Sequence, residues 1–154
     1  IDSLKSPLSE AKPLFINTKS LLRYLKTPKI PIKNIQLTSL SKKLTKAIQR
    51  FGRSIPRLLA KHKEAIIEEQ ITLDRIATCA MSLYAMIASL SKLDTDLTNN
   101  EKPKNTLSSD INIVTFFFKE QLQIIEQSFN TMFCNNDAMI NSLSDQLTGI
   151  KYNL

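Results

Sequence analysis

Apolar side chains recur at intervals of three and four residues through the middle of this chain, and no other feature constrains the fold as strongly. The pattern is longest between residues 40 and 66, where its members are Leu40, Leu44, Ile48, Phe51, Ile55, Leu58, Leu59 and Ile66. This spacing places the side chains on one face of an α-helix. Only two of the 154 residues are Gly, and Leu, Ile and Lys are the most frequent residue types. We therefore predict an all-α fold, a helical bundle of about four main helices preceded by a basic amphipathic segment.

The helix boundaries are predicted from capping residues and Pro. Ser39 or Ser41 is a suitable N-cap for the first long helix. Pro56 removes one backbone hydrogen bond inside this helix and predicts a kink near Gly52. The alternative is two helices with a break at residues 53–55, and we favour one kinked helix.

The second half of the chain predicts three further helices. Residues 68–93 are apolar on most sides, which predicts the central and most buried helix. Residues 94–109 are polar and predict a loop. Ser108 or Ser109 would then cap a helix that runs to about residue 133. A turn at 134–136 precedes a short last helix over residues 137–147, which Gly149 ends.

The chain divides into two regions by composition and charge. Residues 1–34 contain seven Lys or Arg and two acids, so this end has a net charge of +5 out of +7 for the whole chain. Pro28 and Pro31 interrupt the chain after this basic part. We assign residues 1–38 to a basic, Pro-interrupted segment and linker that faces a membrane, and residues 39–154 to a helical C-terminal domain.

Residues 14–26 have the two faces that an interfacial helix needs. Leu side chains fall on one side of the predicted helix and cations on another. Such a helix lies in the plane of an anionic membrane surface. The predicted membrane-binding residues are Leu14, Lys19, Leu21, Leu22, Arg23, Leu25 and Lys26.

A second group of cations lies within the first long predicted helix. No acid occurs between Lys42 and Lys63, and the cations recur at helical spacing. We predict that they form a basic face for a partner or a membrane, made of Lys46, Arg50, Arg53, Arg57 and Lys61. Aromatic residues do not alternate with these cations in the sequence, so nucleic acid is an improbable partner.

The residue types that support catalysis or metal binding are not clustered. His62 is the only His and lies between two Lys, so we interpret it as a surface residue. Glu68 and Glu69 are interpreted as structural partners of nearby cations. Cys79 lies in an apolar stretch and is expected to be buried. We expect no catalytic residue, no cofactor-binding residue and no metal ligand in this chain.

No segment is predicted to span a membrane. The longest uncharged run covers residues 76–91, which is shorter than the roughly 20 apolar residues that a spanning helix needs.

The stretch from Leu58 to Met86 resembles a known domain. Its specific motifs are Lys61-His62-Lys63, Glu69-Gln70 and Leu83-Tyr84-Ala85-Met86, followed by Leu90-Ser91. They are similar to the C-terminal domain shared by very-long-chain acyl-CoA dehydrogenase and acyl-CoA dehydrogenase family member nine. Residues 92–95, Lys-Leu-Asp-Thr, depart from the Arg-rich run that the family has there.

This resemblance implies a function for the chain as part of a larger enzyme. The parent would be a mitochondrial flavoenzyme of fatty acid β-oxidation, with FAD, the acyl-CoA pocket and the catalytic Glu in the preceding core. The extension would support a homodimer and peripheral contact with the matrix side of the inner membrane. The alternative, implied by family member nine, is a non-catalytic helical scaffold that binds a complex I assembly factor.

Overall fold

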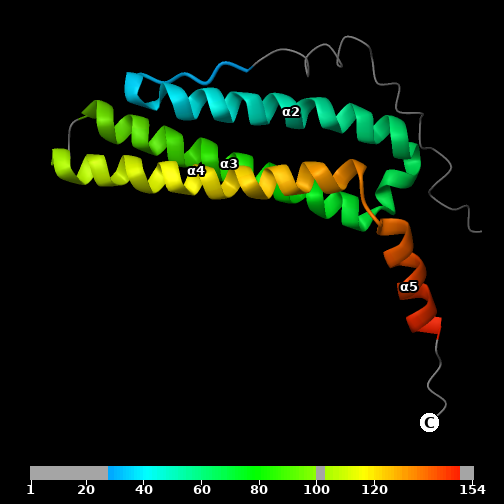
Figure 1. Cartoon of the computed structure of the whole chain (residues 1–154). Helices are drawn as coiled ribbons and strands as arrows, with labels where there is room; N and C mark the ends of the chain where they lie inside the picture. The colour runs from blue at the N-terminus through cyan, green and yellow to red at the C-terminus, as the bar shows by residue number, and fades with distance from the viewer. Residues whose placement is uncertain (1–27, 100–102, 150–154) are drawn as a thin grey trace, which may run out of the picture.

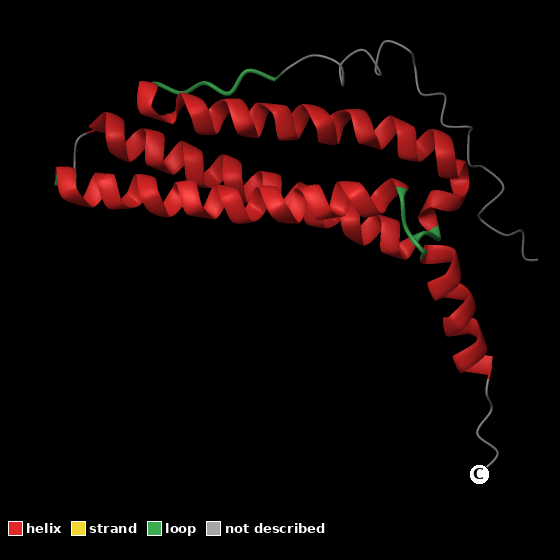
Figure 2. Cartoon of the chain, viewed as in Figure 1, coloured by secondary structure: helices red, strands yellow, loops and turns green. Residues whose placement is uncertain are grey.

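The described part of the chain is entirely helical apart from short connections. The computed structural model describes residues 28–99 and 103–149. The helices are η2 (Ile35–Leu37), α2 (Thr38–His62), η3 (Lys63–Ile67), α3 (Gln70–Asn99), α4 (Lys104–Phe133) and α5 (Asp137–Gly149). Helices α2, α3 and α4 lie side by side, and the described ranges contain no strand (Figures 1 and 2). The predicted all-α bundle is therefore confirmed.

The start of the bundle is fixed by Asn34 and by a contact with the far end of α3. The backbone N–H groups of Lys33 and Asn34 donate to the carboxylate of Asp94, at 2.9–3.1 Å. The side chain of Asn34 accepts from the N–H of Gln36 and caps η2. Because η2 leads directly into α2, no side chain caps α2 itself, and the predicted N-cap at Ser39 or Ser41 is wrong.

Helix α2 continues through Gly52 and Pro56, the two residues at which the sequence predicted a kink. It runs from Thr38 to His62 as one element that contains Pro56, so the preference for one helix over two is confirmed. The hydroxyl of Ser54 donates to the carbonyl of Phe51 at 2.7 Å. Pro56 lacks the backbone N–H that would donate to the carbonyl of Gly52, so the bond from Ser54 to Phe51 is an additional contact in the turn before Pro56.

The chain reverses direction between α2 and α3. Lys63 ends α2 with φ of 51°, and it is the one residue with positive φ among those described. This conformation is uncommon for a residue with a Cβ atom and turns the backbone sharply out of the helix. The short η3 then leads into α3.

Helices α3 and α4 are longer than the sequence indicated. The predicted polar loop over residues 94–109 is wrong, because α3 reaches Asn99 and α4 begins at Lys104. The predicted caps at Ser108 and Ser109 are wrong for the same reason. The residues of the predicted loop are polar, but the hydrogen bonds of Asp94 and the burial of Leu107 hold them in helix. Such packing overrides the local preference of these residues for a loop.

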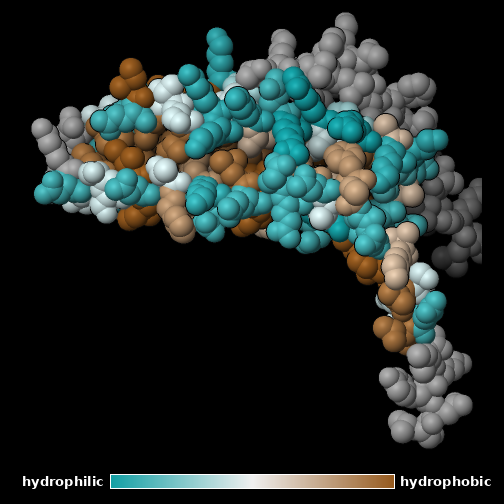
Figure 3. Space-filling view, viewed as in Figure 1, coloured by the Kyte–Doolittle hydropathy of each residue, from teal (hydrophilic) through white to brown (hydrophobic). Residues whose placement is uncertain are grey.

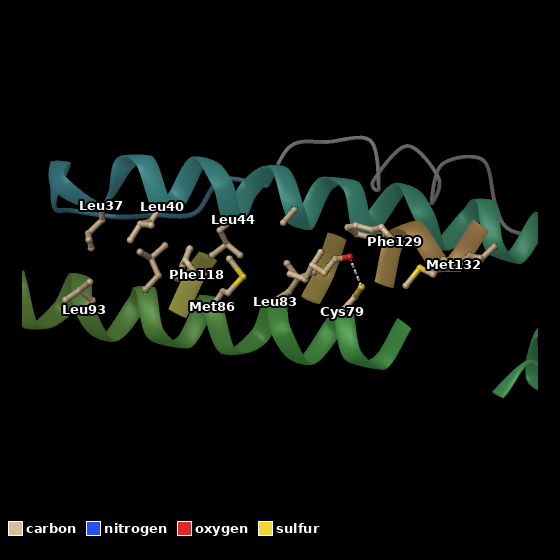
Figure 4. Packing of buried hydrophobic residues seen from close by; sticks show 14 residues of the cluster. Leu37, Leu40, Leu44, Cys79, Leu83, Met86, Leu93, Phe118, Phe129 and Met132 are labelled. Atoms are coloured by element: carbon tan, nitrogen blue, oxygen red, sulfur yellow. Dashed lines mark hydrogen bonds between the residues drawn. The ribbon is translucent and has the colours of Figure 1, made fainter. Parts of the chain in front are cut away.

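One continuous core lies between the three long helices. Its fully buried members come from all three and include Leu44, Met86 and Phe118. Figure 4 shows these side chains pointing into the common interior, with the Cys79 thiol directed at the carbonyl of Ile125. Cys79 is buried, as its apolar surroundings predicted, and both cysteines are free. The core is large enough to fix the three helices relative to one another.

Helix α5 projects away from the bundle (Figure 1). It starts at Asp137 after a turn, as predicted. Asp137 forms a two-fold hydrogen-bonded ion pair with Arg75 of α3, at 2.5 and 2.8 Å. Both side chains are largely removed from solvent. This pair attaches the base of α5 to the bundle, while residues 138–144 and 146–148 of the helix are exposed.

Candidate functional site: the basic groove between α2 and α4

Cations form a continuous row along the flank of α2. The helix contains seven Lys or Arg and no acid, so its charge equals the net charge of the whole chain. The members of the row are Lys43, Lys46, Arg50, Arg53, Arg57 and Lys61. Their spacing places them on one side of the helix over about 27 Å. All six are exposed, so the row is open to a partner.

The structure brings five of the predicted site residues together in this row. These are Lys46, Arg50, Arg53, Arg57 and Lys61, as expected from their helical spacing. The other predicted set, Leu14, Lys19, Leu21, Leu22, Arg23, Leu25 and Lys26, lies outside the described residues. The candidate site is therefore built from α2 and its neighbours alone.

Helix α4 adds aromatic rings beside the cations. The guanidinium of Arg50 stacks over the ring of Phe129 at 4.4 Å, and that of Arg57 over the ring of Phe133 at 4.6 Å. Arg50 also pairs with Glu126 of α4. Stacking holds the guanidinium plane against the ring and leaves the N–H groups at its edge available as donors.

These residues line a groove of about 360 Å³ between the two helices. The lining consists of Lys46, Gln49, Arg50, Arg53, Ser54, Arg57, Phe129 and Phe133. Figure 3 shows hydrophilic side chains over α2 and along α4, with apolar side chains in the band between them. Within the described residues no carboxylate pairs with Lys46, Arg53 or Arg57. The groove can therefore accept a small anion.

A separate polar cluster lies where α2, α3 and α5 meet. The expectation that His62 is a surface residue is wrong: its side chain is 13% exposed, with Nδ1 3.5 Å from a carboxylate oxygen of Glu69. Its Nε2 is buried without a hydrogen-bond partner. The chain reversal at Lys63 turns the ring inward. Among residues 28–99 and 103–149, no group of His, Cys, Asp or Glu is arranged to hold a metal ion.

Charge in this cluster stabilises structure. The hydrogen bond from Arg75 holds the pKa of Asp137 below its ordinary value, against the opposing effect of burial. The same bond raises the pKa of Arg75. The hydrogen-bonded partner of Arg75 comes from α5 and is neither Glu68 nor Glu69, the acids that the sequence suggested as partners of nearby cations. Burial raises the pKa of the Cys79 thiol, which keeps it protonated and unreactive.

The outer face of α3 is largely apolar, and no other described helix covers it. Side chains pointing away from the core include Tyr84, which is 74% exposed, and Met81, which is 65% exposed. The exposed residues of this face are Leu73, Ala77, Ala80, Met81, Tyr84, Ile87 and Ala88. Helix α3 still contributes more buried residues than any other described helix, so the expectation that it is the most buried one is confirmed, although only one of its two apolar faces packs in the bundle. A contiguous apolar face of this kind marks an interaction surface.

Length and composition alone would let α3 cross a membrane, and among the described helices it is the one that meets this measure. Core helices of soluble proteins meet it as well. Its packed side carries Ser82, Thr72 and Asp94 and is covered by α2 and α4. The cations of α2 are distributed along most of the length of α2. We therefore interpret the outer face as a surface for protein contact.

Sequence reasoning missed two parts of the site. Phe129 and Phe133 are far from the cations in the sequence, and only the packing of α4 on α2 brings them together. No sequence signal would have identified this pairing. The outer face of α3 could have been recognised from the sequence. The helix is apolar on both sides, and two neighbouring helices can cover only one of these sides.

Comparison with known proteins identifies a family of C-terminal domains that matches most of the chain. The family described as "ACAD9/ACADV, C-terminal domain" matches residues 35–149. Very long-chain specific acyl-CoA dehydrogenase, mitochondrial, of Bos taurus is 41% identical over 51 residues, and that of Homo sapiens is 38% identical over 52 residues. These segments cover 33% and 34% of this chain and 8% of each relative. No solved structure matches the chain significantly.

Proposed function

Because the chain belongs to the family of ACAD9/ACADV C-terminal domains, we propose that it is the membrane-association and dimer-supporting part of a mitochondrial, FAD-dependent acyl-CoA dehydrogenase. The substrates would be long-chain and very-long-chain acyl-CoA. The matched segment is a small fraction of each relative's length. The enzyme's chemistry would then reside in the rest of the polypeptide.

The uncovered outer face of α3 is the observation that carries this proposal. Met81 and Tyr84 are large and exposed, and leaving such residues in water loses the free energy that their burial provides. A partner that covers the face would recover this free energy. The rest of the dehydrogenase, or its dimer mate, is the partner that the family assignment suggests.

The flavin would bind outside this chain. One widespread type of dinucleotide site uses glycines in a loop between a strand and a helix. The described residues have no strand, and Gly52 lies inside α2. They do not form a site of this type, and the family assignment suggests that the flavin binds in the rest of the dehydrogenase.

Membrane association is supported by the position of the charge. The cations of α2 face outward in one row and are not neutralised by acids on the same helix. An anionic bilayer attracts such a row. The relatives are named as mitochondrial proteins, which supports a mitochondrial location, and the matrix side of the inner membrane is the part of this proposal that awaits a test.

The test is to isolate the native polypeptide that contains this sequence. We expect a product several times longer than 154 residues, yellow from bound flavin, that dehydrogenates long-chain acyl-CoA and sediments as a dimer. Tyr84→Glu should weaken the dimer or the docking of the domain, while Gln127→Glu, on the exposed side of α4, should not. A colourless native product of about this chain's length would refute the proposal.

A second candidate is a scaffold role in complex I assembly. The row of cations on α2, of which only Arg50 pairs with a described carboxylate, is also suited to an acidic protein partner. Capture of an assembly factor from mitochondrial extract should then be lost on charge reversal of Arg50, Arg53 and Arg57. Capture that survives this reversal would contradict the scaffold role through α2.

A further inference from the structure

We propose that the groove between α2 and α4 binds the phosphate group of an anionic phospholipid headgroup. This inference rests on the proposed membrane function and names the site and the ligand chemistry that it uses. The groove residues are Lys46, Arg50, Arg53 and Arg57 of α2, with Phe129 and Phe133 of α4.

The donors of the groove match a phosphate group. Arg53 and Arg57 are four residues apart on an exposed helix face, which places their side chains next to each other. Both are exposed, and no described carboxylate neutralises them. Two neighbouring guanidinium groups can donate several N–H bonds to the oxygens of one phosphate.

The aromatic rings orient the donors before any ligand arrives. Phe133 lies under Arg57 and Phe129 under Arg50. Phe129 is 4% exposed and part of the core, so its ring is fixed. A guanidinium stacked on a fixed ring has lost much of its freedom already, which lowers the entropy cost of binding.

Size and shape favour a lipid headgroup over a macromolecule that lies across the groove. The volume of about 360 Å³ suits a small molecular group, since ligand pockets begin near 300 Å³. The row of cations, four of which line the groove, extends along α2 over about 27 Å. A flat anionic surface can contact such a row while one headgroup enters the groove.

Nucleic acid is less suited to this surface. Single-stranded nucleic acid needs exposed aromatic faces on which bases stack. Here the guanidinium groups already cover the rings. The groove therefore offers charge and hydrogen bonds but no platform for a base.

The test measures sedimentation of the 154-residue chain with vesicles. One set contains three parts phosphatidylcholine to one part cardiolipin, and the other phosphatidylcholine alone. We expect binding to the first set only. Arg53→Glu should weaken this binding about tenfold or more. The matched control Lys92→Glu changes the net charge equally on α3, where Lys92 is 73% exposed, and should have a much smaller effect.

Two variants that keep the charge separate a built site from general attraction. Arg57→Lys removes the planar fork, and Phe133→Leu removes the ring under Arg57. Each should weaken binding about threefold, with the helical circular dichroism spectrum unchanged. Unchanged binding by both variants, or equal losses for Arg53→Glu and Lys92→Glu, would overturn the proposal.

Competitors identify the source of the phosphate. Inorganic phosphate should displace the chain from vesicles only weakly. Displacement at low millimolar inorganic phosphate would indicate a soluble ligand, and stronger binding to single-stranded DNA than to vesicles would indicate nucleic acid; either result overturns the lipid assignment. Failure here leaves the dehydrogenase assignment intact, because the mass and flavin content of the native protein test that independently.

Discussion

The outer flank of α2 and the outer face of α3 both lie on the outside of the bundle, but they differ in charge and polarity. Both helices bury one side in the same core. On its other side α2 presents six exposed cations, whereas α3 presents Met81, Tyr84 and other apolar side chains. Charged side chains are well solvated in water and attract partners of opposite charge from a distance. Apolar side chains contribute favourable free energy only when a partner in direct contact removes them from water. We infer that a partner covers the outer face of α3 permanently, whereas a partner binds the outer flank of α2 reversibly.

Both surfaces depend on the shared core, so the largest effect should follow from its disruption. Phe118 is 1% exposed and comes from α4. Phe118→Ala should lower the free energy of unfolding by about 4 kcal/mol, because a cavity replaces the ring. Urea denaturation followed by circular dichroism measures this. Phe116→Ala is the matched control: Phe116 is 65% exposed, and a loss as large as that for Phe118→Ala would contradict the described packing.

The pair between Arg75 and Asp137 should give the next effect, and it depends on pH. Arg75→Leu leaves a buried carboxylate unpaired and should cost about 3 kcal/mol at neutral pH. The folded pKa of Asp137 lies below its ordinary value of 3.8. The stabilisation is therefore complete above that value and is lost as the pH falls through the folded pKa.

Urea denaturation at several pH values checks this sign. The difference between wild type and Arg75→Leu should shrink as the pH falls below the ordinary carboxyl pKa. Lys92→Met removes an exposed pair on one helix and should cost less than about 0.5 kcal/mol at every pH. A constant difference for Arg75→Leu would argue against a charged pair at the base of α5.

Substitutions on the two outer surfaces should have the smallest effects on stability. Arg50→Ala removes a stacking contact and an exposed ion pair, for a loss of about 1 kcal/mol. Tyr84→Ala should change the free energy of unfolding of this chain by less than about 0.5 kcal/mol, because Tyr84 is 74% exposed. Denaturation of the two variants side by side gives the comparison. A larger loss for Tyr84→Ala would mean that its face is already covered.

The sequence predicted helix wherever the apolar period was long. It placed α2 correctly, and it placed the turn before Asp137 correctly. It failed between residues 94 and 109, because Asp94 is held in helix by two backbone N–H groups that are 61 and 60 residues away in the sequence. It also placed His62 at the surface, since neighbouring Lys residues say nothing about the backbone reversal at Lys63.

The candidate site was predicted in part. Helical spacing alone was enough to place five cations of α2 in one row. The aromatic half of the groove depends on how α4 packs against α2, and a single sequence does not encode that contact in any local pattern. The uncovered face of α3 was mistaken for core for a related reason: composition reports that a face is apolar, but it does not report which molecule buries it.

Covalent footprinting tests the central contrast most directly. The native polypeptide and the isolated 154-residue chain would be exposed to hydroxyl radicals, which modify Met81 and Tyr84, and to acetic anhydride, which modifies Lys46 and Lys61. We predict strong protection of Met81 and Tyr84 in the native polypeptide, with unchanged labelling of both lysines. Equal modification of Met81 and Tyr84 in the two proteins would contradict the account, because the outer face of α3 would then be uncovered in both.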